Sequence, residues 1–431
     1  MNVTSTLYIG IDVSLDTNQV CAMNFNQDVF FNSSFKNSFE DSKVMTKRIL
    51  DILHKEHLSH VMITMESTSL YFFHIANHLS MDEELKQFDC AVYCVNPKTI
   101  ANYKKSFIEM AKNDPKDAWL IADFVRVGRC KKLNQWRGAS YVALQRLTRY
   151  RLHLSQNLSK EKNYALNNIY LKFSQLRKKE GKDDDTNPFS NLFGTTSSAV
   201  LTDFITMDEI IAKPLEELVA YLDSLSKKHF TNPEAVAKLL KQCANDSYRL
   251  DKLSYDALQI TIASNIRMIS MLEKELKNLD KQIFDFVKGI DSHAVTVLRS
   301  IPGVGPVYAA GILAEIGHIS CFRNDAALSK YAGIAWDDHS SGKLISEDNH
   351  LIDSGNMFLK YYFEEASNLM RLNDSVFRAF YSRKYHEATT HKHKRALVLT
   401  TRKFIRLVYC LLRDDKLYVN PETGEVKTQS E

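Results

Sequence analysis

The sequence predicts an α/β domain at the N-terminus followed by an all-α remainder. Over the first 135 residues or so, short apolar runs typical of strands alternate with helical stretches. From about Tyr141 onward, apolar residues instead recur every three or four positions, the spacing of one helix face. A chain of 431 residues is also too long for a single core. We therefore expect domains at 1–135, 136–290 and 291–418, with a polar tail at 419–431.

The N-terminal region reads as a mixed sheet with helices between its later strands. Expected strands cover 7–13, 19–25, 29–35, 60–66 and 88–95, and expected helices cover 41–57 and 70–79. Three consecutive strands followed by strand–helix alternation are typical of a mixed α/β sheet.

The middle region predicts a pair of long helices. Apolar residues at helical spacing run from Leu147 to Phe173 with basic residues between them. A second series forms an a/d seam of nearly three heptads, at Ile269, Leu272, Leu276, Leu279, Ile283 and Phe286. Antiparallel packing of these two helices, as a coiled coil, would bury both series. The polar segment 182–198 is expected to be a loop, with helices resuming by Leu215.

The C-terminal region is expected to be mostly helical and to open with a helix-hairpin-helix. The string IPGVGPVYAAGILAEIG places Gly303 and Gly305 in a tight turn between two helices. Backbone N–H groups in such a turn can hold a DNA phosphate without reading sequence. A helical hairpin that serves packing alone is the alternative.

Composition indicates a folded protein without a membrane span. Hydrophobic residues make up 44% and charged residues 25% of the chain, and no apolar run approaches the roughly 20 residues that a span needs. The N-terminus has no signal-peptide pattern. Seven cysteines, scattered and odd in number, argue against a disulfide framework or a zinc site. We expect a cytoplasmic protein.

Basic residues are concentrated in two segments, although the net charge is only +4. Residues 137–180 contain ten Lys or Arg and two acids, and residues 378–406 contain nine and one. One such segment is as readily a solvated helix face. Two of them favour a nucleic-acid partner bound through its phosphates.

Four acidic residues are the candidate metal ligands. Asp12 and Glu66 each end a predicted strand, so they can meet at one edge of the sheet. Asp114 and Asp117 lie three apart at the start of a helix and share one face. Converging carboxylates repel one another unless cations lie between them, and hard oxygen ligands suit Mg²⁺.

These acids also fit two other interpretations. Asp114 and Asp117 around Pro115 also fit a helix cap, a role that does not exclude metal binding. The string GIDVS around Asp12 also opens actin-like ATPases. Those folds need glycine-rich phosphate loops, and this chain contains no Gly-Gly pair, so the kinase reading is rejected.

Ser340 and Ser341 precede Gly342 in a polar stretch and are candidate nucleophiles. Serine–glycine pairs are common in loops, so loop composition is the plain alternative. A serine nucleophile needs a base, a metal or positive charge to activate it. The adjacent His339 is not assigned as that base, because adjacency in sequence does not orient the ring.

Taken in order, the strings IGIDVS, KNDPKDA, IPGVGPVYAAGILAEIG, LSKYAGIAWDDHSSGK and GNMFLK resemble the DEDD transposases of the insertion-sequence 110/1111 family. These proteins are also described as bridge-RNA-guided recombinases. The resemblance runs from about Ile9 to about Tyr418. Each string is weak alone, whereas their order and spacing together are specific.

The resemblance implies a fold, a chemistry and partners. It implies an N-terminal RNase H-like domain, related to Holliday-junction resolvases, then a coiled coil and a C-terminal domain with a catalytic serine. It assigns Asp12, Glu66, Asp114 and Asp117 to the Mg²⁺-binding tetrad. It assigns Ser341, or Ser340 if the motif slips by one, to the nucleophile that forms a phosphoserine link to DNA. It further implies donor and target DNA, a structured bridge RNA, and a homo-oligomer, from dimer to tetramer, that shares a composite site.

The basic helix after Arg137 suits an RNA duplex bound by shape, with Arg146, Arg149 and Arg151 as the expected contacts. Sequence choice would then rest on base pairing. The chain departs from the family pattern at IAWDDHSSG, where a proline-containing run is usual, and in the longer stretch from Lys182 to about Tyr255. The first departure leaves the choice of serine open.

The sequence leaves two alternative functions. One is an Mg²⁺-dependent, junction-resolving endonuclease in which the serine is incidental. The other is a non-catalytic nucleic-acid-binding protein descended from a transposase, against which the complete tetrad counts.

Overall fold

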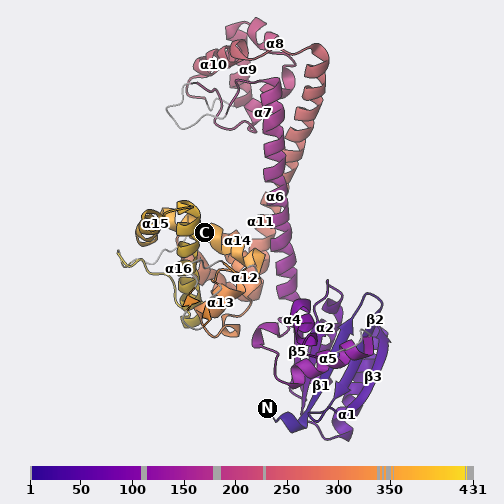
Figure 1. The fold of residues 1–431 in the computed structure, drawn as a ribbon. Helices are drawn as coiled ribbons and strands as arrows, with labels where there is room; N and C mark the ends of the chain where they lie inside the picture. Colours follow the sequence, from indigo (N-terminus) through magenta and orange to yellow (C-terminus); the bar gives the residue numbers. More distant parts are fainter. Residues whose placement is uncertain are drawn as a thin grey trace. The chain divides into compact units, whose positions relative to one another are not determined.

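A computed structural model describes residues 2–107, 114–177, 186–226, 230–336, 340–341, 344–345, 351–352, 354–422 and 424 (Figure 1). The chain divides into two compact units. The first comprises Met1–Arg146 and Phe284–Glu431, and the second comprises Leu147–Ile283.

The N-terminal part of the first unit is built on one mixed sheet. Its strands are β1 (Thr6–Val13), β2 (Thr17–Met23), β3 (Val29–Lys36), β4 (His60–Glu66) and β5 (Cys90–Val95), in the order β3-β2-β1-β4-β5. The first three strands run antiparallel, whereas β1, β4 and β5 run parallel. All five predicted strands are confirmed to within two residues at each end. This order with these directions is that of an RNase H-like domain.

Helices cover both faces of this sheet. They are α1 (Phe39–Lys55), α2 (Phe72–Met81), α3 (Glu83–Lys86), α4 (Pro97–Lys104) and α5 (Asp114–Arg126). Alternate side chains of β1 point to opposite faces. Leu7, Ile9 and Ile11 pack with Met45 of α1 and Ile75 of α2. Tyr8 packs instead with α5, so the residues that alternate with it point toward α5.

Gly10 allows α5 to lie directly on β1. A Cβ at this position would be 2.2 Å from both the Ala118 carbonyl oxygen and the Ala122 amide nitrogen. No side chain larger than hydrogen fits there without displacing the backbone of α5. The glycine therefore sets the distance between β1 and the helix that carries Asp114 and Asp117.

The C-terminal part of the first unit is helical, as predicted. After the end of α11 (Lys252–Ser300) come α12 (Pro306–Ile316), α13 (Asp325–Tyr331), α14 (Met357–Asn373), α15 (Ser375–Glu387) and α16 (Lys392–Asp414). Asp291 has non-helical dihedral angles inside α11, and its side chain accepts a hydrogen bond from the Ala294 amide at 2.9 Å. This cap begins a new helix close to the predicted start of the C-terminal domain.

The second unit contains the predicted antiparallel helix pair. Ion pairs join the two helices, between Arg151 of α6 (Ala139–Lys172) and Asp280 of α11, and between Lys162 and Glu273. Residue numbers fall along one helix as they rise along the other, which defines an antiparallel pair. A supercoiled geometry for the pair stays a prediction.

Two expectations for the middle region need correction. Phe286 is 38% exposed and Val287 is buried in its place, because the apolar series on α11 continues from Ile283 by four residues rather than three. Helices do resume by Leu215, as predicted, with α7 (Thr195–Asp203) and α8 (Met207–Ala212) before α9 (Leu215–Ser226) and α10 (Pro233–Asp246). The expected loop at 182–198 therefore ends earlier, at the start of α7, and its first residues lie outside the described chain.

A buried lysine holds the second unit together. The Lys172 ammonium donates to the carbonyl oxygens of Leu201 and Phe204, each at 2.7 Å, and to Gln259 of α11. Burial lowers the pKa of Lys172 to about 8. The lysine thus links the end of α6 to the end of α7 and to α11 in place of an apolar contact.

The described residues bear on two features that the sequence did not predict, a membrane span and a disulfide framework. Within them, no helix is both long and apolar enough to cross a membrane. The seven cysteines all lie in described segments and are free thiols.

Candidate active site

The first two candidate ligands are neighbours at the carboxyl edge of the sheet. The parallel register pairs Ile11 with Met65, which places Asp12 beside Glu66. Asp12 shares a sheet face with Tyr8 and Gly10, the face covered by α5. Glu66 also accepts a hydrogen bond from the Thr68 hydroxyl at 2.7 Å, which restrains its carboxylate.

The other two candidates lie in the first turn of α5, where Asp114 is exposed and the Asp117 side chain is 20% exposed. Two contacts besides Gly10 hold this turn. The Asn32 side chain of β3 donates to the Pro115 carbonyl oxygen at 2.8 Å, and the ammonium of Lys104 in α4 pairs with Asp117. These contacts tie the start of α5 to the sheet and to α4.

The other three candidate carboxylates act on the charge of Asp12. The pKa of Asp12 is raised to about 6, first by burial and then by the charges of Glu66, Asp117 and Asp114. Lys104 acts in the opposite direction. A carboxyl group surrounded by like charges resists ionisation, so a cation placed among the four would relieve the repulsion.

The donor set fits a hard divalent cation. All four candidates offer carboxylate oxygens, and a lysine ammonium already neutralises Asp117. Within the described residues, no three His, Cys, Asp or Glu side chains are grouped closely enough to ligate one ion.

The glycines of the predicted helix-hairpin-helix have unlike surroundings. Gly303 has a φ of 83°, and a Cβ there would lie 2.8–2.9 Å from Leu369 and Met370 of α14. Gly305 precedes α12 and has open space where a Cβ would be. Gly303 therefore permits close helix packing, whereas Gly305 leaves the start of α12 accessible. The helix-hairpin-helix and its DNA contact stay predictions.

Residues 332–356 connect α13 to α14 and include Ser340 and Ser341, and the two ends of this serine segment lie close together. Gly355 lies so close to Gly333 that a Cβ on it would be 2.5 Å from the Gly333 Cα. Hydrogen bonds from Asn356 N to Tyr331 O, at 2.7 Å, and from Ile352 N to Ala335 O, at 3.0 Å, join the two ends. Both ends of the segment are thus fixed to the junction of α13 and α14.

Between these two ends the structure describes only part of the serine segment. Ser340 and Ser341 form the short strand β6 (Ser340–Ser341), which pairs antiparallel with β7 (Leu344–Ile345). Their side chains, and His339, lie outside what is described. The assignment of the nucleophile therefore stays a prediction.

The three arginines expected to bind RNA differ in their surroundings. Arg146 is exposed, Arg149 is partly buried, and Arg151 donates to both oxygens of Asp280 at 2.8 and 3.2 Å. A two-point ion pair occupies much of the Arg151 guanidinium. Arg146 is the most accessible of the three.

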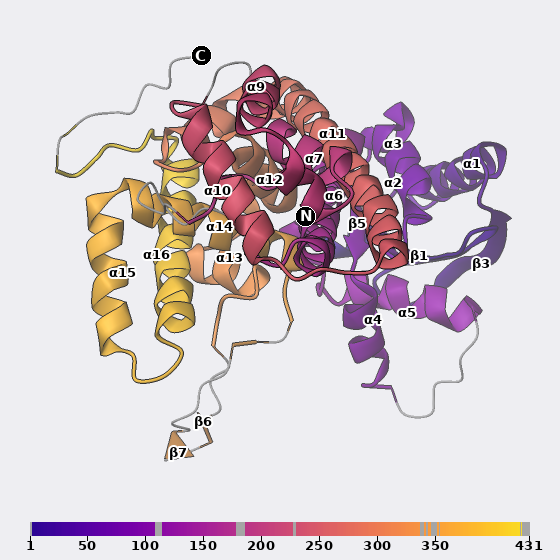
Figure 2. The ribbon, with the colours of Figure 1, turned by 90° about the horizontal axis from the view of Figure 1, so that it is seen from above.

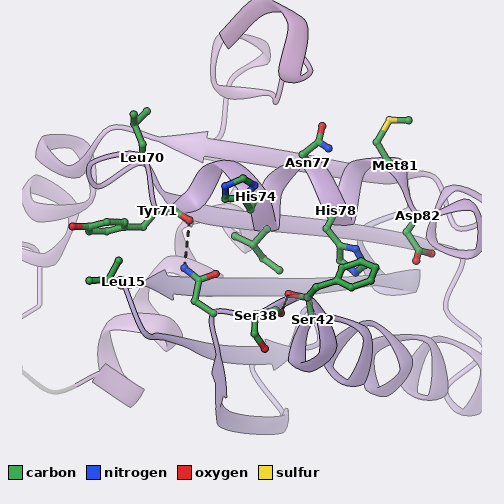
Figure 3. A pocket seen from close by; sticks show the side chains of 13 residues that line it. Leu15, Ser38, Ser42, Leu70, Tyr71, His74, Asn77, His78, Met81 and Asp82 are labelled. Atoms are coloured by element: carbon green, nitrogen blue, oxygen red, sulfur yellow. Dashed lines mark hydrogen bonds between the residues drawn. The ribbon is translucent and has the colours of Figure 1, made fainter. Parts of the chain in front are cut away.

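A groove of about 900 Å³ in the N-terminal domain is separate from the carboxylates (Figure 3). Its lining comes from the segment after β1, from α1 and from α2, and includes Leu15, Phe39, Tyr71 and His78. Since α1 and α2 cover the sheet face opposite α5, the groove lies across the sheet from the tetrad. Sequence patterns did not indicate it.

The fold and site define an RNase H-like protein with a four-carboxylate edge and a helical C-terminal region. Comparison with known families agrees in two places. A model described as "Transposase", of the DEDD type named for IS110, matches residues 9–173, and one described as "Transposase IS116/IS110/IS902 family" matches residues 295–382. Together they span more than half of the chain. The chain belongs to the IS110 family of DEDD transposases.

Curated relatives are similar over part of their length. The chain is 30% identical to the "Insertion element IS110 uncharacterized 43.6 kDa protein" of Streptomyces coelicolor, over 37% of this chain and 38% of that protein. It is 27% identical to the "Pilin gene-inverting protein" of Moraxella bovis, over 43% and 59%. It is 26% identical to the "Transposase for insertion sequence element IS1111A" of Coxiella burnetii, over 32% and 42%. These matches thus span between about a third and three fifths of each relative.

A solved structure, "T. thermophilus RuvC in complex with Holliday junction substrate", matches 28% of this chain and 96% of that chain. The identity is 15% and the TM-score is 0.21, a likeness too slight to argue from.

Proposed function

We propose that the protein is a DNA transposase that cuts and rejoins DNA strands as a site-specific recombinase. The observation that carries this proposal is the position of Asp12 beside Glu66 at the edge of an RNase H-like sheet. The helix that carries Asp114 and Asp117 in its first turn packs on the same sheet face as Asp12. Family membership supports it, and so do the relatives named as transposase and gene-inverting protein.

In this proposal Asp12, Glu66, Asp114 and Asp117 hold Mg²⁺. When bound, the metal would stabilise negative charge on the phosphate and assist its displacement. The Lys104 ammonium pairs with Asp117 in this structure, so a metal ion bound by Asp117 would displace it from that carboxylate. Gly10 and Asn32 keep the first turn of α5 within reach of Asp12.

The nucleophile is the hydroxyl of Ser341, with Ser340 as the alternative. Its oxygen forms a bond to the phosphorus as the bond from phosphorus to one deoxyribose oxygen breaks, and the leaving oxygen takes up a proton. A hydroxyl of the partner DNA strand then attacks the phosphoserine and releases the serine. Each step exchanges one phosphate ester for another, so rejoining needs no added energy source.

The proposal further includes a structured bridge RNA and a homo-oligomer, from dimer to tetramer, that completes the site. The exposed Arg146 and its neighbours on α6 support a duplex-binding role. If the element's flanking RNA guides joining, an unrelated RNA abolishes sequence-specific joining. Unchanged sequence-specific joining with the unrelated RNA would show that the flanking RNA does not guide the reaction.

The decisive experiment is detection of a covalent protein–DNA adduct on a denaturing gel, with Mg²⁺, junction DNA and the flanking RNA. Wild type is compared with Ser340→Ala, Ser341→Ala and Asp12→Ala. We expect an adduct that is lost in Asp12→Ala and in one serine variant. Metal-dependent cleavage with no adduct in any sample would instead assign the protein to the junction-resolving endonucleases.

A further inference from the structure

Helices α15 and α16, with the connection 388–391, form a hairpin that we name the basic hairpin. The two helices lie side by side in both views (Figures 1 and 2) and are in contact. The hairpin follows α14 directly, with the buried Asp374 capping the start of α15 at 2.9 Å. It is therefore firmly attached to the core of the C-terminal domain.

Charge on the basic hairpin is almost entirely of one sign. Between residues 378 and 406 the chain has nine Lys or Arg and one acid. That acid, Glu387, pairs with Lys384 at 2.5 Å and with Arg383 at 3.7 Å. Six of the basic residues are exposed: Arg378, Arg383, Lys392, Lys394, Arg395 and Arg406. A surface with this charge attracts a polyanion.

Three aromatic rings of the hairpin each have a cation over one face. The Arg371 guanidinium lies 4.2 Å from the Tyr381 ring centre, and the Lys403 ammonium lies 4.5 and 4.8 Å from those of Phe377 and Phe380. Those faces are not available for stacking with unpaired bases, the usual contact with single strands, whereas Tyr385 is 37% exposed. Against this one exposed ring the hairpin presents six exposed cations, which favours the phosphates of a duplex.

The start of α16 gathers positive charge where a helix normally avoids it. Its first turn contains Lys392, Lys394 and Arg395, has no acidic residue, and has no side-chain cap. A helix N-terminus carries partial positive charge, so three cations there oppose the helix dipole. Folding alone does not favour this arrangement, whereas a bound anion does.

We propose that the basic hairpin is a docking surface for the phosphate backbone of duplex DNA. This inference rests on the proposed function, which makes DNA the substrate. The hairpin would hold the duplex through phosphates without reading its sequence, leaving the choice of site to other contacts.

The test is the salt dependence of binding to a DNA duplex by the full chain. The triple variant Lys392→Gln, Lys394→Gln, Arg395→Gln is compared with wild type and with a control. The control, Lys43→Gln, Lys47→Gln, Lys55→Gln, removes the same charge from exposed positions on α1. That helix also carries acids, with Glu40 and Asp41 in its first turn and Asp51 between Lys47 and Lys55. Thermal melting establishes that all three proteins are folded.

If the hairpin contacts three phosphates, the slope of log K against log salt falls by about 2 to 3 in the hairpin variant. Affinity at about 150 mM salt should fall about tenfold or more, while the control keeps the wild-type slope. Equal slopes for the hairpin variant and wild type would overturn the inference. Loss of binding to an RNA duplex alone, with DNA binding intact, would also overturn it.

The inference and the proposed function can fail separately. A reduced slope in the hairpin variant, with no cleavage or adduct in wild type, would uphold the docking surface and refute the recombinase. Conversely, cleavage and an adduct in wild type, with an unchanged salt slope in the hairpin variant, would uphold the recombinase and refute the docking surface.

Discussion

At the scale of single residues, the carboxylate site depends on a glycine that bears no functional group. The Gly10 Cα lies against the backbone of α5 one residue beyond Asp117. Any displacement of the helix there moves two of the four carboxylates away from Asp12. Gly10 is therefore a positioning residue for the site.

Gly10→Ala should lower the free energy of unfolding by about 1–3 kcal/mol through overpacking. Cleavage activity should also fall at temperatures where the variant is still fully folded. Thermal melting and the cleavage assay measure the two effects. Gly289→Ala is the matched control, since a Cβ there meets nothing within 4 Å in an exposed helix. Its stability should be unchanged or slightly raised. A fully active Gly10→Ala protein would contradict the positioning role.

Asp12 makes stability depend on pH in a direction that can be derived. Its pKa in the folded protein, about 6, lies above the ordinary value of 3.8. The folded state therefore holds the proton more tightly, and its stability falls as pH rises through this window. Above it, the ionised carboxylate is held among like charges.

Asp12→Asn should therefore raise the stability of the metal-free protein near pH 7.5. We expect about 1 kcal/mol after allowance for solvent screening, or about 2 °C in melting temperature. Added Mg²⁺ should stabilise wild type but not the variant. Asp51→Asn on the exposed side of α1 is the control and should leave both responses unchanged. A variant that melts below wild type without metal would refute the repulsion argument.

Sequence patterns located the carboxylates but not the residues that position them. Asp12 and Glu66 could be found because strand ends are readable from short apolar runs. Gly10, Asn32 and Lys104 act through contacts between segments distant in sequence, namely β1 with α5, β3 with α5 and α4 with α5. Such contacts leave no periodic signal in a single sequence.

At the scale of elements, the α6–α11 pair depends on charges as well as apolar packing. Arg151 and Asp280 are only 19% and 33% exposed, so their ion pair is partly shielded from water. The same arginine is a predicted RNA contact. The two roles can be separated by exchanging the charges.

Arg151→Asp should lower the stability of the second unit by about 1–3 kcal/mol, and adding Asp280→Arg should restore most of it. Hydrogen exchange of α6 and α11 reports the fold. If Arg151 serves only the helix pair, the double variant binds RNA like wild type. Restored folding with weakened RNA binding would assign Arg151 to the RNA as well.

Strands were easier to predict here than the helices of the middle region. The central strands β1, β4 and β5 are compact apolar runs between turn residues. Helix α7 is short and starts in a polar, turn-rich stretch, so the local pattern assigned its first residues, 195–198, to the predicted loop. The apolar series on α11 was predicted to end at Phe286, whereas Val287 is the buried residue. Steps of three and of four residues are both compatible with a helix face, so the last member of a series cannot be chosen from spacing alone.

At the scale of the whole molecule, the proposed cutting chemistry and the proposed DNA docking use different residues. Removing metal ions with a chelator should abolish cleavage and adduct formation, yet leave DNA affinity and its salt slope within about twofold of their original values. Duplex binding assays with and without chelator test this. A large loss of affinity on chelation would mean that metal-bridged phosphates supply much of the binding.

The predicted domains at 1–135, 136–290 and 291–418 stay a prediction, and the compact units follow a different division. The change from strands to helices near residue 136 marks the end of the N-terminal fold. The compact units, however, divide at 146/147 and 283/284, inside α6 and α11. A helix that continues from one unit into the next carries no break in its pattern, so composition cannot show where packing changes.

The touching glycines at positions 333 and 355 have a consequence for how this protein can diverge. Because the segment leaves and returns at the same point, its length can change without moving α13 or α14. The entropy cost of a longer loop grows only logarithmically, by about 0.6 kcal/mol per doubling. By this geometry, residues inserted into or removed from the stretch between these glycines would leave α13 and α14 in place.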